Sequence, residues 1–378
     1  MLPSRQNVMK RGTSLYLDLV RFVAAVVVFL EHFREHTRNS FAAFWRSHPF
    51  LYAHLDSYSE IAVIVFFVLS GYVIAHVLAT RENTLTEFAT SRLARLYSVV
   101  VPALLLTAVT NHAEALRYPT AFAAYENVPA IIRYTGTGLF INNFWLWPDL
   151  VPPNVPFWAL TFEVCYYVGI AIFVFGKGFG RLAGLIVLSV LAGPTMVLLA
   201  PTWLLGYGAY HFSKNGLNPR LAAGVWLLSM ALLLSCFVVE ESFRQPLKFL
   251  RMPDASVGGL LTAYAAAVCF TVNVIAFNSF STAAERVLQP ASTFIRWLGS
   301  ITFALYLFHE PILSLLTVYP VAGRSSPAQM AALVGFTFLT VGTVGWLCER
   351  SKGSYKRFFL FLGERFSLLS PSPNPRAP

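Results

Sequence analysis

Apolar runs of about 17–25 residues recur along almost the whole chain, and that is the length an α-helix needs to cross a lipid bilayer. Apolar residues make up 56% of the 378 residues and charged residues only 12%. A soluble globular domain is excluded, because so much apolar surface would find no core large enough to bury it. We therefore predict an all-α protein, built as a polytopic transmembrane helical bundle.

Ten spans are predicted from these runs, and the sixth is short enough to be only half-inserted. They cover roughly residues 14–33, 59–79, 93–110, 157–175, 182–199, 201–213, 221–239, 257–279, 297–318 and 328–348. Residues 131–147 compete as an eleventh span. Because this segment contains Arg133 and the pair Asn142 and Asn143, we interpret it as re-entrant or interfacial, although a full crossing stays open.

The distribution of Lys and Arg predicts the orientation. With a cytoplasmic N-terminus and ten spans, the cytoplasmic side receives about twice as many Lys and Arg as the outer side, as the positive-inside rule requires. Both termini are then cytoplasmic, in a multi-pass protein of a cell membrane of the bacterial inner-membrane type. Orientation accounts for most of the net charge of +10, so the expected partner is the bilayer and not nucleic acid.

One membrane domain is expected to fill the chain. Residues 1–13 form a cytoplasmic segment, 14–348 the transmembrane domain, and 349–378 a basic, Pro-rich cytoplasmic tail. The first apolar run contains Asp18, Arg21 and Glu31 and lacks a small-residue cleavage site, so it reads as a retained span. The four cysteines all fall in apolar runs without metal-binding spacing, and we expect no metal.

Arg21 and His32 are the most informative polar residues, because both lie within the first predicted span. Eleven helical residues return two side chains to one face of a helix, about 16 Å apart along its axis. A charged group at this depth costs at least about 2.5 kcal/mol on insertion scales, so the pair predicts a functional site. Glu31 is expected to point about 100° away from His32 as an interfacial residue, and His36, His48 and His54 are expected in surface loops.

Three further motifs follow in order along the chain. They are SRLARLYSVVVP with Arg92 and Arg95, PFWALTFEVCYYV with Trp158 and Glu163, and SITFALYLFHEPIL with Tyr306 and His309. Together with the Arg21 and His32 pair, they resemble the motifs of the acyltransferase family 3 membrane proteins over about residues 14–348. One position departs from that pattern: Ala159 stands where a Ser is expected, and whether Thr161 substitutes for it stays open.

The resemblance implies an integral membrane O-acyltransferase of envelope polysaccharides or other glycoconjugates. The expected donor is cytoplasmic acyl-CoA, with acetyl-CoA preferred, and the acceptor is a hydroxyl of a glycan on the extracytoplasmic side. His32 would be the base, since a neutral imidazole can accept the hydroxyl proton. Arg92 and Arg95, one helical turn apart, would bind the donor's phosphates. Arg21 would contact the CoA arm or the thioester, unless Asp18 holds it in a salt bridge.

Glu163 and His309 are the remaining catalytic candidates. Glu163 would orient His32 or bind sugar, against the alternative of a structural ion pair. His309 would take part in catalysis, orient a helix or pair with Glu310. The acceptor, the acyl group, direct or covalent transfer, and transfer to a separate extracytoplasmic partner are left open. A transporter of a small or lipid-linked substrate is the alternative function, although the sequence shows no repeat of the kind such proteins typically have.

Overall fold

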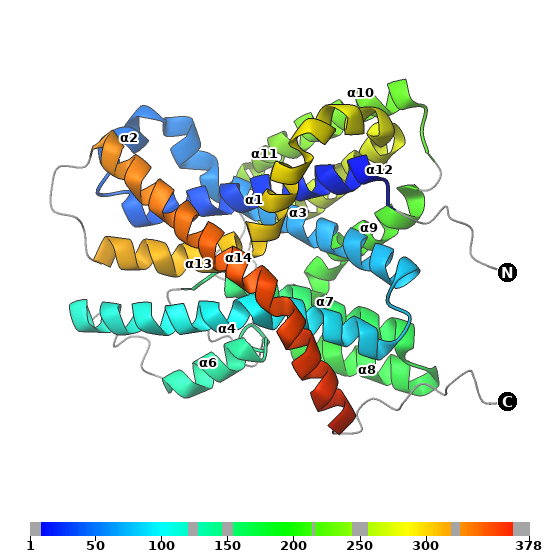
Figure 1. Ribbon diagram of the computed structural model, residues 1–378. Coiled ribbons are helices and arrows are strands. Elements are labelled where there is room, and N and C mark those ends of the chain that lie inside the picture. Colours follow the sequence, from blue (N-terminus) through cyan, green and yellow to red (C-terminus); the bar gives the residue numbers. More distant parts are fainter. Residues whose placement is uncertain are drawn as a thin grey trace.

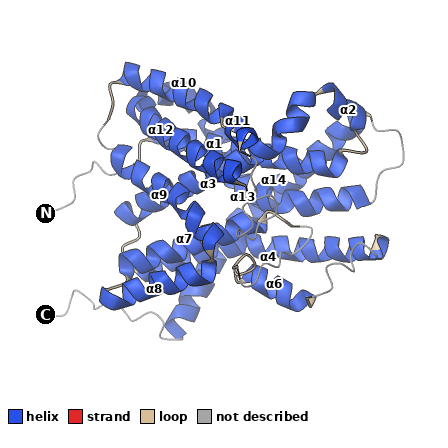
Figure 2. Cartoon of the chain, turned by 180° about the vertical axis from the view of Figure 1, so that it is seen from behind, coloured by secondary structure: helices blue, strands red, loops and turns tan. Residues whose placement is uncertain are grey.

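The computed structural model describes residues 9–119, 128–145, 154–213, 216–243, 256–318 and 326–365. Within these ranges the chain forms helices joined by loops, and no strand is present (Figure 2). Seven helical stretches are long and apolar enough to cross a membrane, or up to eight with the bent pair described below. This confirms the predicted polytopic helical bundle. The count of ten spans and the cytoplasmic termini stay predictions, since one stretch, Val257–Leu316, contains two helices.

Figure 1 shows the arrangement of the labelled helices. Their bounds are α1 Arg11–Thr37, α2 Ala42–Ser47, α3 Pro49–Thr80, α4 Leu85–Arg117, α6 Ala130–Gly138, α7 Phe157–Phe175, α8 Gly178–Ala192, α9 Pro194–Phe212, α10 Pro219–Ser235, α11 Phe237–Ser242, α12 Val257–Leu288, α13 Ser292–Val318 and α14 Pro327–Arg365, with a 3₁₀ turn η3 at Gln289–Ala291 between α12 and α13.

Helices α1 and α3 lie at the centre of the bundle. Helix α1 packs against α3, α12 and α13, while α4 packs against α13 and α14. The most apolar window of α3 is 72% buried, as expected for a helix that is hydrophobic on all sides. Polar bonds tie α1 to α12: Thr13 donates to Asn278 over 2.8 Å, and Tyr16 donates to Asn273. Such interhelical bonds hold helices together where no water is available.

The fifth and sixth predicted spans end at different residues from those expected. The chain breaks at Gly193, where φ is +85°, and α9 begins at Pro194, so α8 and α9 meet at a bend of 119°. The predicted boundary near residue 200 was wrong, because Pro201 is accommodated inside α9. A side chain at position 193 would also lie 2.5 Å from Trp145, so both the backbone and the packing favour glycine there.

The segment at 131–147 does not form one continuous helix in its described part. The nine-residue α6 is too short to cross a membrane, and turns follow it as far as Trp145. Residues 146 and 147 lie outside the described residues. At the other end of the chain, α14 continues beyond residue 348 to Arg365. The first part of the predicted tail is therefore helical, and the start of α1 and the end of α14 lie toward the same end of the bundle (Figure 1).

Candidate active site

Two groups of polar side chains lie at different levels of α1. The first, which we call the histidine cluster, consists of Glu31, His32, His36, His309 and Glu310. The second, which we call the basic vestibule, consists of Asp18, Arg21, Arg95, Arg296, Glu349 and Lys352. Because α1 is a single unbroken helix, it delivers a member of each group to the bundle interior.

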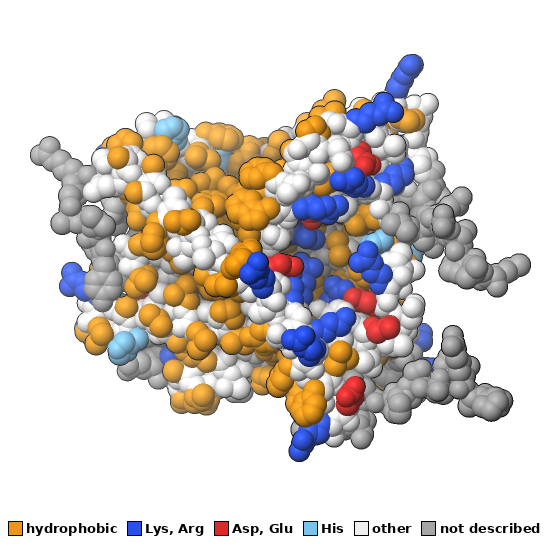
Figure 3. All heavy atoms as spheres, in the orientation of Figure 1, with side chains coloured by type: hydrophobic (Ala, Val, Ile, Leu, Met, Phe, Trp, Pro, Cys, Tyr) orange, Lys and Arg blue, Asp and Glu red, His pale blue; other side chains and the backbone are white. Residues whose placement is uncertain are grey.

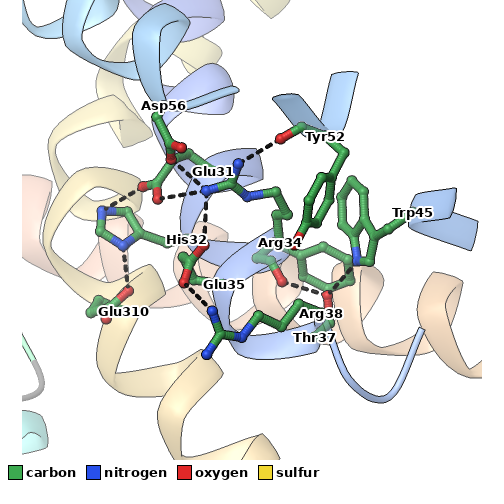
Figure 4. Close-up of polar contacts among 11 residues, drawn as sticks. Glu31, His32, Arg34, Glu35, Thr37, Arg38, Trp45, Tyr52, Asp56 and Glu310 are labelled. Atoms are coloured by element: carbon green, nitrogen blue, oxygen red, sulfur yellow. Dashed lines mark hydrogen bonds and ion pairs between the residues drawn. The ribbon is translucent and has the colours of Figure 1, made fainter. Parts of the chain in front are cut away.

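His32 lies between two carboxylates in the histidine cluster. Its Nδ1 is 3.0 Å from Glu310 Oε2, and its Nε2 is 3.3 Å from Glu31 Oε2. Figure 4 shows the two carboxylates on opposite edges of the imidazole ring. The expectation that Glu31 points away was wrong, because its long side chain reaches back to the ring of its neighbour. The side chains of His32 and Glu310 are only 17% and 8% exposed, so their interaction is shielded from water.

Glu310 binds a second histidine from α1. His36 Nε2 is 3.1 Å from Glu310 Oε1, while the other carboxylate oxygen faces His32. Residues four apart lie on one face of a helix, so α1 presents both imidazoles to the same carboxylate on α13. His36 was expected in a surface loop, and that prediction was wrong.

His309 is fully buried beside His32, with their ring centroids 5.1 Å apart. Its Nδ1 bonds to the carbonyl of Leu305 over 2.7 Å, and because a carbonyl only accepts, the proton sits on Nδ1. Within the described residues, Nε2 of His309 is buried without a hydrogen-bond partner. The alternative that His309 pairs with Glu310 was wrong, since Glu310 pairs with His32 and His36.

His32, His309 and Glu310 also offer possible metal-ligand atoms that lie within 4.8 Å of one another. However, His32 and Glu310 face each other directly at 3.0 Å. Ligands of one ion point toward a common centre, whereas a carboxylate oxygen that faces an imidazole nitrogen at 3.0 Å is the arrangement of an acid–base pair. The contacts of this cluster therefore fit proton transfer better than metal binding.

Arg34 anchors the end of α1 that bears His32. Its guanidinium donates to Glu35 over 2.8 Å, to the carbonyl of Tyr52 over 2.7 Å, and to Asp56 (Figure 4). Tyr52 and Asp56 belong to the first turns of α3, and the Arg34 side chain is only 6% exposed. This network locks α1 against α3 two residues from His32.

Arg21 and its neighbours form the other group. Arg21 Nη1 lies 3.8 Å from Asp18 Oδ1, so the predicted competing partner is present, although the contact is long. Asp18 Oδ2 is also 3.2 Å from Nη1 of Arg296 on α13. This close approach of α1 and α13 requires Gly299, because a Cβ there would lie 2.9 Å from the Asp18 Cβ.

The two arginines predicted to bind phosphate together have different surroundings. A capping box starts α4, in which Thr84 and Glu87 satisfy each other's backbone N–H groups. Two turns later, Arg92 Nη2 lies 2.8 Å from both oxygens of Glu82 and is buried. Arg95, by contrast, has no carboxylate within 4 Å among the described residues. The structure thus separates a paired arginine from an unpaired one.

Two cavities meet at Arg21 and Arg95. An inner cavity of about 70 Å³ is lined by both residues and by Arg92, Glu163 and Tyr306, among others. The basic vestibule surrounds a second cavity of about 320 Å³. Arg21, Arg95 and Phe303 line both cavities, so the two cavities lie next to each other, with the inner one deeper in the bundle.

Glu163 belongs to the inner cavity. It accepts hydrogen bonds from Ser70, over 2.7 Å, and from Tyr167, while both nitrogens of His32 face other carboxylates. The alternative in which Glu163 orients His32 is therefore not supported. Ala159, where the motif expects Ser, lines the same cavity. Thr161 does not replace that hydroxyl, because it is fully buried and donates to Asn142 over 2.6 Å.

Tyr306 connects the inner cavity to the histidine cluster. Its ring lines the cavity, and it stands edge-on to His309 and Phe66 at centroid distances of 6.4 and 5.6 Å. The ring of Tyr306 therefore lies between the inner cavity and His309, whose ring centroid is 5.1 Å from that of His32.

Sequence reasoning missed four residues of the site: His36, Arg296, Glu310 in its role beside His32, and Lys352. Glu310 directly follows His309 in the motif that carried the resemblance, and that adjacency was the available signal. His36 lies four residues after His32, a spacing that repeats one helix face. Arg296 and Lys352 had no such signal, since each sits at the edge of an apolar run where the positive-inside rule already expects a cation.

Comparison with known proteins gives a family match and one relative. The acyltransferase family 3 model, described as an acyltransferase domain, matches residues 14–348. An O-acetyl transferase of Shigella phage Sf6 is 33% identical over 90 residues, which is 24% of this chain and 24% of that protein. The chain thus matches about a quarter of the length of that relative. No solved structure matches.

Proposed function

Because this chain belongs to acyltransferase family 3, we propose that it transfers an acetyl group from cytoplasmic acetyl-CoA to a hydroxyl of a sugar or glycoconjugate on the extracytoplasmic side. The family match shows a membrane acyltransferase, and the name of the phage relative supports O-acetyl transfer. One observation carries the proposal. A single helix holds a histidine that faces two carboxylates at one level and lines a basic cavity at another.

His32 acts as the base in this proposal. The Glu310 carboxylate, 3.0 Å from Nδ1, favours the tautomer with its proton on Nδ1, which leaves the lone pair on Nε2. An acceptor hydroxyl that reaches Nε2 displaces Glu31, whose contact of 3.3 Å is the longer of the two. Glu31 then keeps a partner in Arg34, which lies 3.9 Å away.

The reaction balances without a further co-reactant. Nε2 of His32 takes the hydroxyl proton while the hydroxyl oxygen attacks the thioester carbonyl. The carbon–sulfur bond breaks, and the departing thiolate takes the proton from Nε2, so the products are the acetyl ester and free CoA. His309 lies beside His32, with the ring planes tilted by 50°, and its Nε2 is buried without a hydrogen-bond partner among the described residues.

The donor reaches His32 from the vestibule. Its thioester arm extends past Arg21 and Arg95 into the inner cavity, while the nucleotide stays outside the bundle. The separation of about 16 Å between Arg21 and His32 along α1 is then spanned by the arm of the donor. Transfer across the membrane needs no movement of the whole nucleotide.

The test is acetyl transfer from radiolabelled acetyl-CoA to glycans in membranes that contain the protein. We expect His32→Ala to abolish labelling at an unchanged protein level. His48→Ala is the matched control, because His48 is exposed and lies outside both clusters. Full labelling in the His32→Ala membranes would reject the base assignment. Uptake of a substrate without any acetylation would instead support the alternative of a transporter.

A further inference from the structure

The basic vestibule gathers charge from four helices. Its cavity of about 320 Å³ is lined by four cations and two carboxylates, contributed by α1, α4, α13 and α14. They are Arg21, Arg95, Arg296 and Lys352, with Asp18 and Glu349. Figure 3 shows Lys and Arg side chains, with fewer Asp and Glu, gathered toward the end of the bundle where α1 begins and α14 ends.

The carboxylates of the vestibule do not balance its cations. Asp18 serves both Arg21 and Arg296, at 3.8 and 3.2 Å, and Glu349 pairs with Lys352 one turn away on α14. Arg95 has no carboxylate within 4 Å among the described residues. Four cations against two carboxylates leave an excess of two positive charges around one cavity. A partly buried excess of this kind is stabilised by an anionic ligand.

Arg92 does not contribute to this excess. Both of its contacts at 2.8 Å go to Glu82, and its guanidinium stacks over Phe88 at 5.4 Å from the ring centroid. Its side chain is 9% exposed and that of Glu82 is 11% exposed. An anion that bound Arg92 would have to displace a buried carboxylate, so Arg92 is better explained as an anchor between the start of α4 and the preceding loop.

Arg296 and Lys352 are accessible to a ligand from outside the bundle. Their side chains are 49% and 33% exposed, whereas the side chain of Arg21, which also borders the inner cavity, is 17% exposed. Lys352 reaches the cavity because α14 runs unbroken past its apolar half and packs against α4 and α13. Arg296 and Lys352 thus lie on the exposed side of the vestibule, and Arg21 and Arg95 lie on the side next to the inner cavity.

We propose that Arg95, Arg296 and Lys352 form the binding site for the phosphates of the nucleotide part of the donor, in place of a fork of Arg92 and Arg95. The proposal rests on the proposed function, and it adds α13 and α14 to the donor site. Guanidinium groups bind phosphate oxygens through paired N–H groups, and a lysine ammonium adds a compact charge. Arg21, which borders the inner cavity as well, is left to contact the uncharged arm.

The experiment measures binding to the purified full-length protein in a neutral detergent. CoA and pantetheine are compared, because they share the thiol arm and differ in the nucleotide with its phosphates. We expect Arg296→Gln/Lys352→Gln to weaken CoA binding by about tenfold, which corresponds to roughly 1.4 kcal/mol, and to leave pantetheine binding unchanged. Lys356→Gln is the matched control, an exposed cation one turn further along α14.

Each outcome separates this proposal from the proposed function. His32→Ala protein should bind CoA as the wild type does, even if it transfers nothing. Wild-type protein that fails to bind CoA, or a double variant that binds CoA normally, would overturn the phosphate site. An equal loss of CoA and pantetheine binding would also overturn it. Phosphatidylglycerol that copurifies with the wild type but not with the double variant, without CoA binding, would reassign the cations to a lipid headgroup.

Discussion

The two polar groups on α1 are built in opposite ways. In the histidine cluster, both nitrogens of His32 face carboxylates, and Glu310 is shared with His36. In the basic vestibule, cations outnumber carboxylates, and Arg95 has no carboxylate within 4 Å among the described residues. A group that moves protons must be held in one orientation before the substrate arrives, whereas a group that binds an anion must keep charge uncompensated. Under the proposed function, chemistry belongs to one level of α1 and donor binding to the other.

The largest expected effect is at His32. We expect His32→Gln to lower kcat by roughly a thousandfold, the usual contribution of a positioned general base, while the affinity for CoA stays the same. Single-turnover transfer and CoA binding, both measured on one preparation, check the two halves of this statement. If CoA binding falls in proportion to activity, His32 belongs to the donor site, and the two polar groups on α1 do not have separate functions.

Glu310 should show the next largest effect. Glu310→Gln keeps the shape of the side chain but removes the charge that holds Nδ1 of His32, and a hydrogen bond to a charged group contributes about 1.5–3 kcal/mol. We expect kcat to fall by about tenfold to a hundredfold with the KM for acetyl-CoA unchanged. The matched control is Glu35→Gln, because Glu35 is a carboxylate on the same helix whose contacts are with Arg34 and Arg38. Equal losses in both variants would assign Glu310 a purely structural role.

The features of the fold and the site that depend on local sequence could be predicted, whereas those that depend on tertiary contacts could not. The helices followed from apolar runs, since length and hydropathy are local properties, yet the break at Gly193 depends on a backbone conformation that the run of apolar residues concealed. The place of Arg21 and His32 on one helix could be predicted because one apolar run contains both residues. The partner of His32 could not be predicted, because Glu310 reaches it only through the packing of α13 on α1. Lys352 was assigned to the tail for a similar reason: α14 continues after its apolar residues end.

Arg92 and Arg95 offer a direct test within one helix. Arg95→Gln should raise the KM for acetyl-CoA about tenfold, as expected for the loss of one charge-assisted contact, at a normal protein level. Arg92→Gln should instead leave Glu82 buried without its partner and lower stability by roughly 3 kcal/mol. Steady-state kinetics and thermal unfolding in detergent separate the two effects.

The charge-neutral double variant Glu82→Gln/Arg92→Gln is the control for this pair. It removes the unpaired carboxylate, so we expect it to recover much of the lost stability and to retain the wild-type KM for acetyl-CoA. A KM that rises as much in this double variant as in Arg95→Gln would restore Arg92 to the donor site.

The smallest effect concerns the contact that holds Asp18 between the two arginines. A Cβ added at Gly299 would lie 2.9 Å from the Asp18 Cβ and 3.0 Å from its carboxylate, so Gly299→Ala must push α13 away from α1 or turn Asp18 out of the vestibule. Overpacking of this kind costs about 1–3 kcal/mol. Gly335→Ala is the control, because nothing lies within 4 Å of a Cβ there and alanine favours the helix. Relative to the wild type, the melting temperature should fall for Gly299→Ala and rise for Gly335→Ala.

CoA binding tests what happens to Asp18 itself. If Asp18 turns outward, Arg21 and Arg296 lose their shared carboxylate, and CoA should bind the Gly299→Ala protein at least as tightly as the wild type. Weaker CoA binding would show that Asp18 orients the cations instead of competing for them.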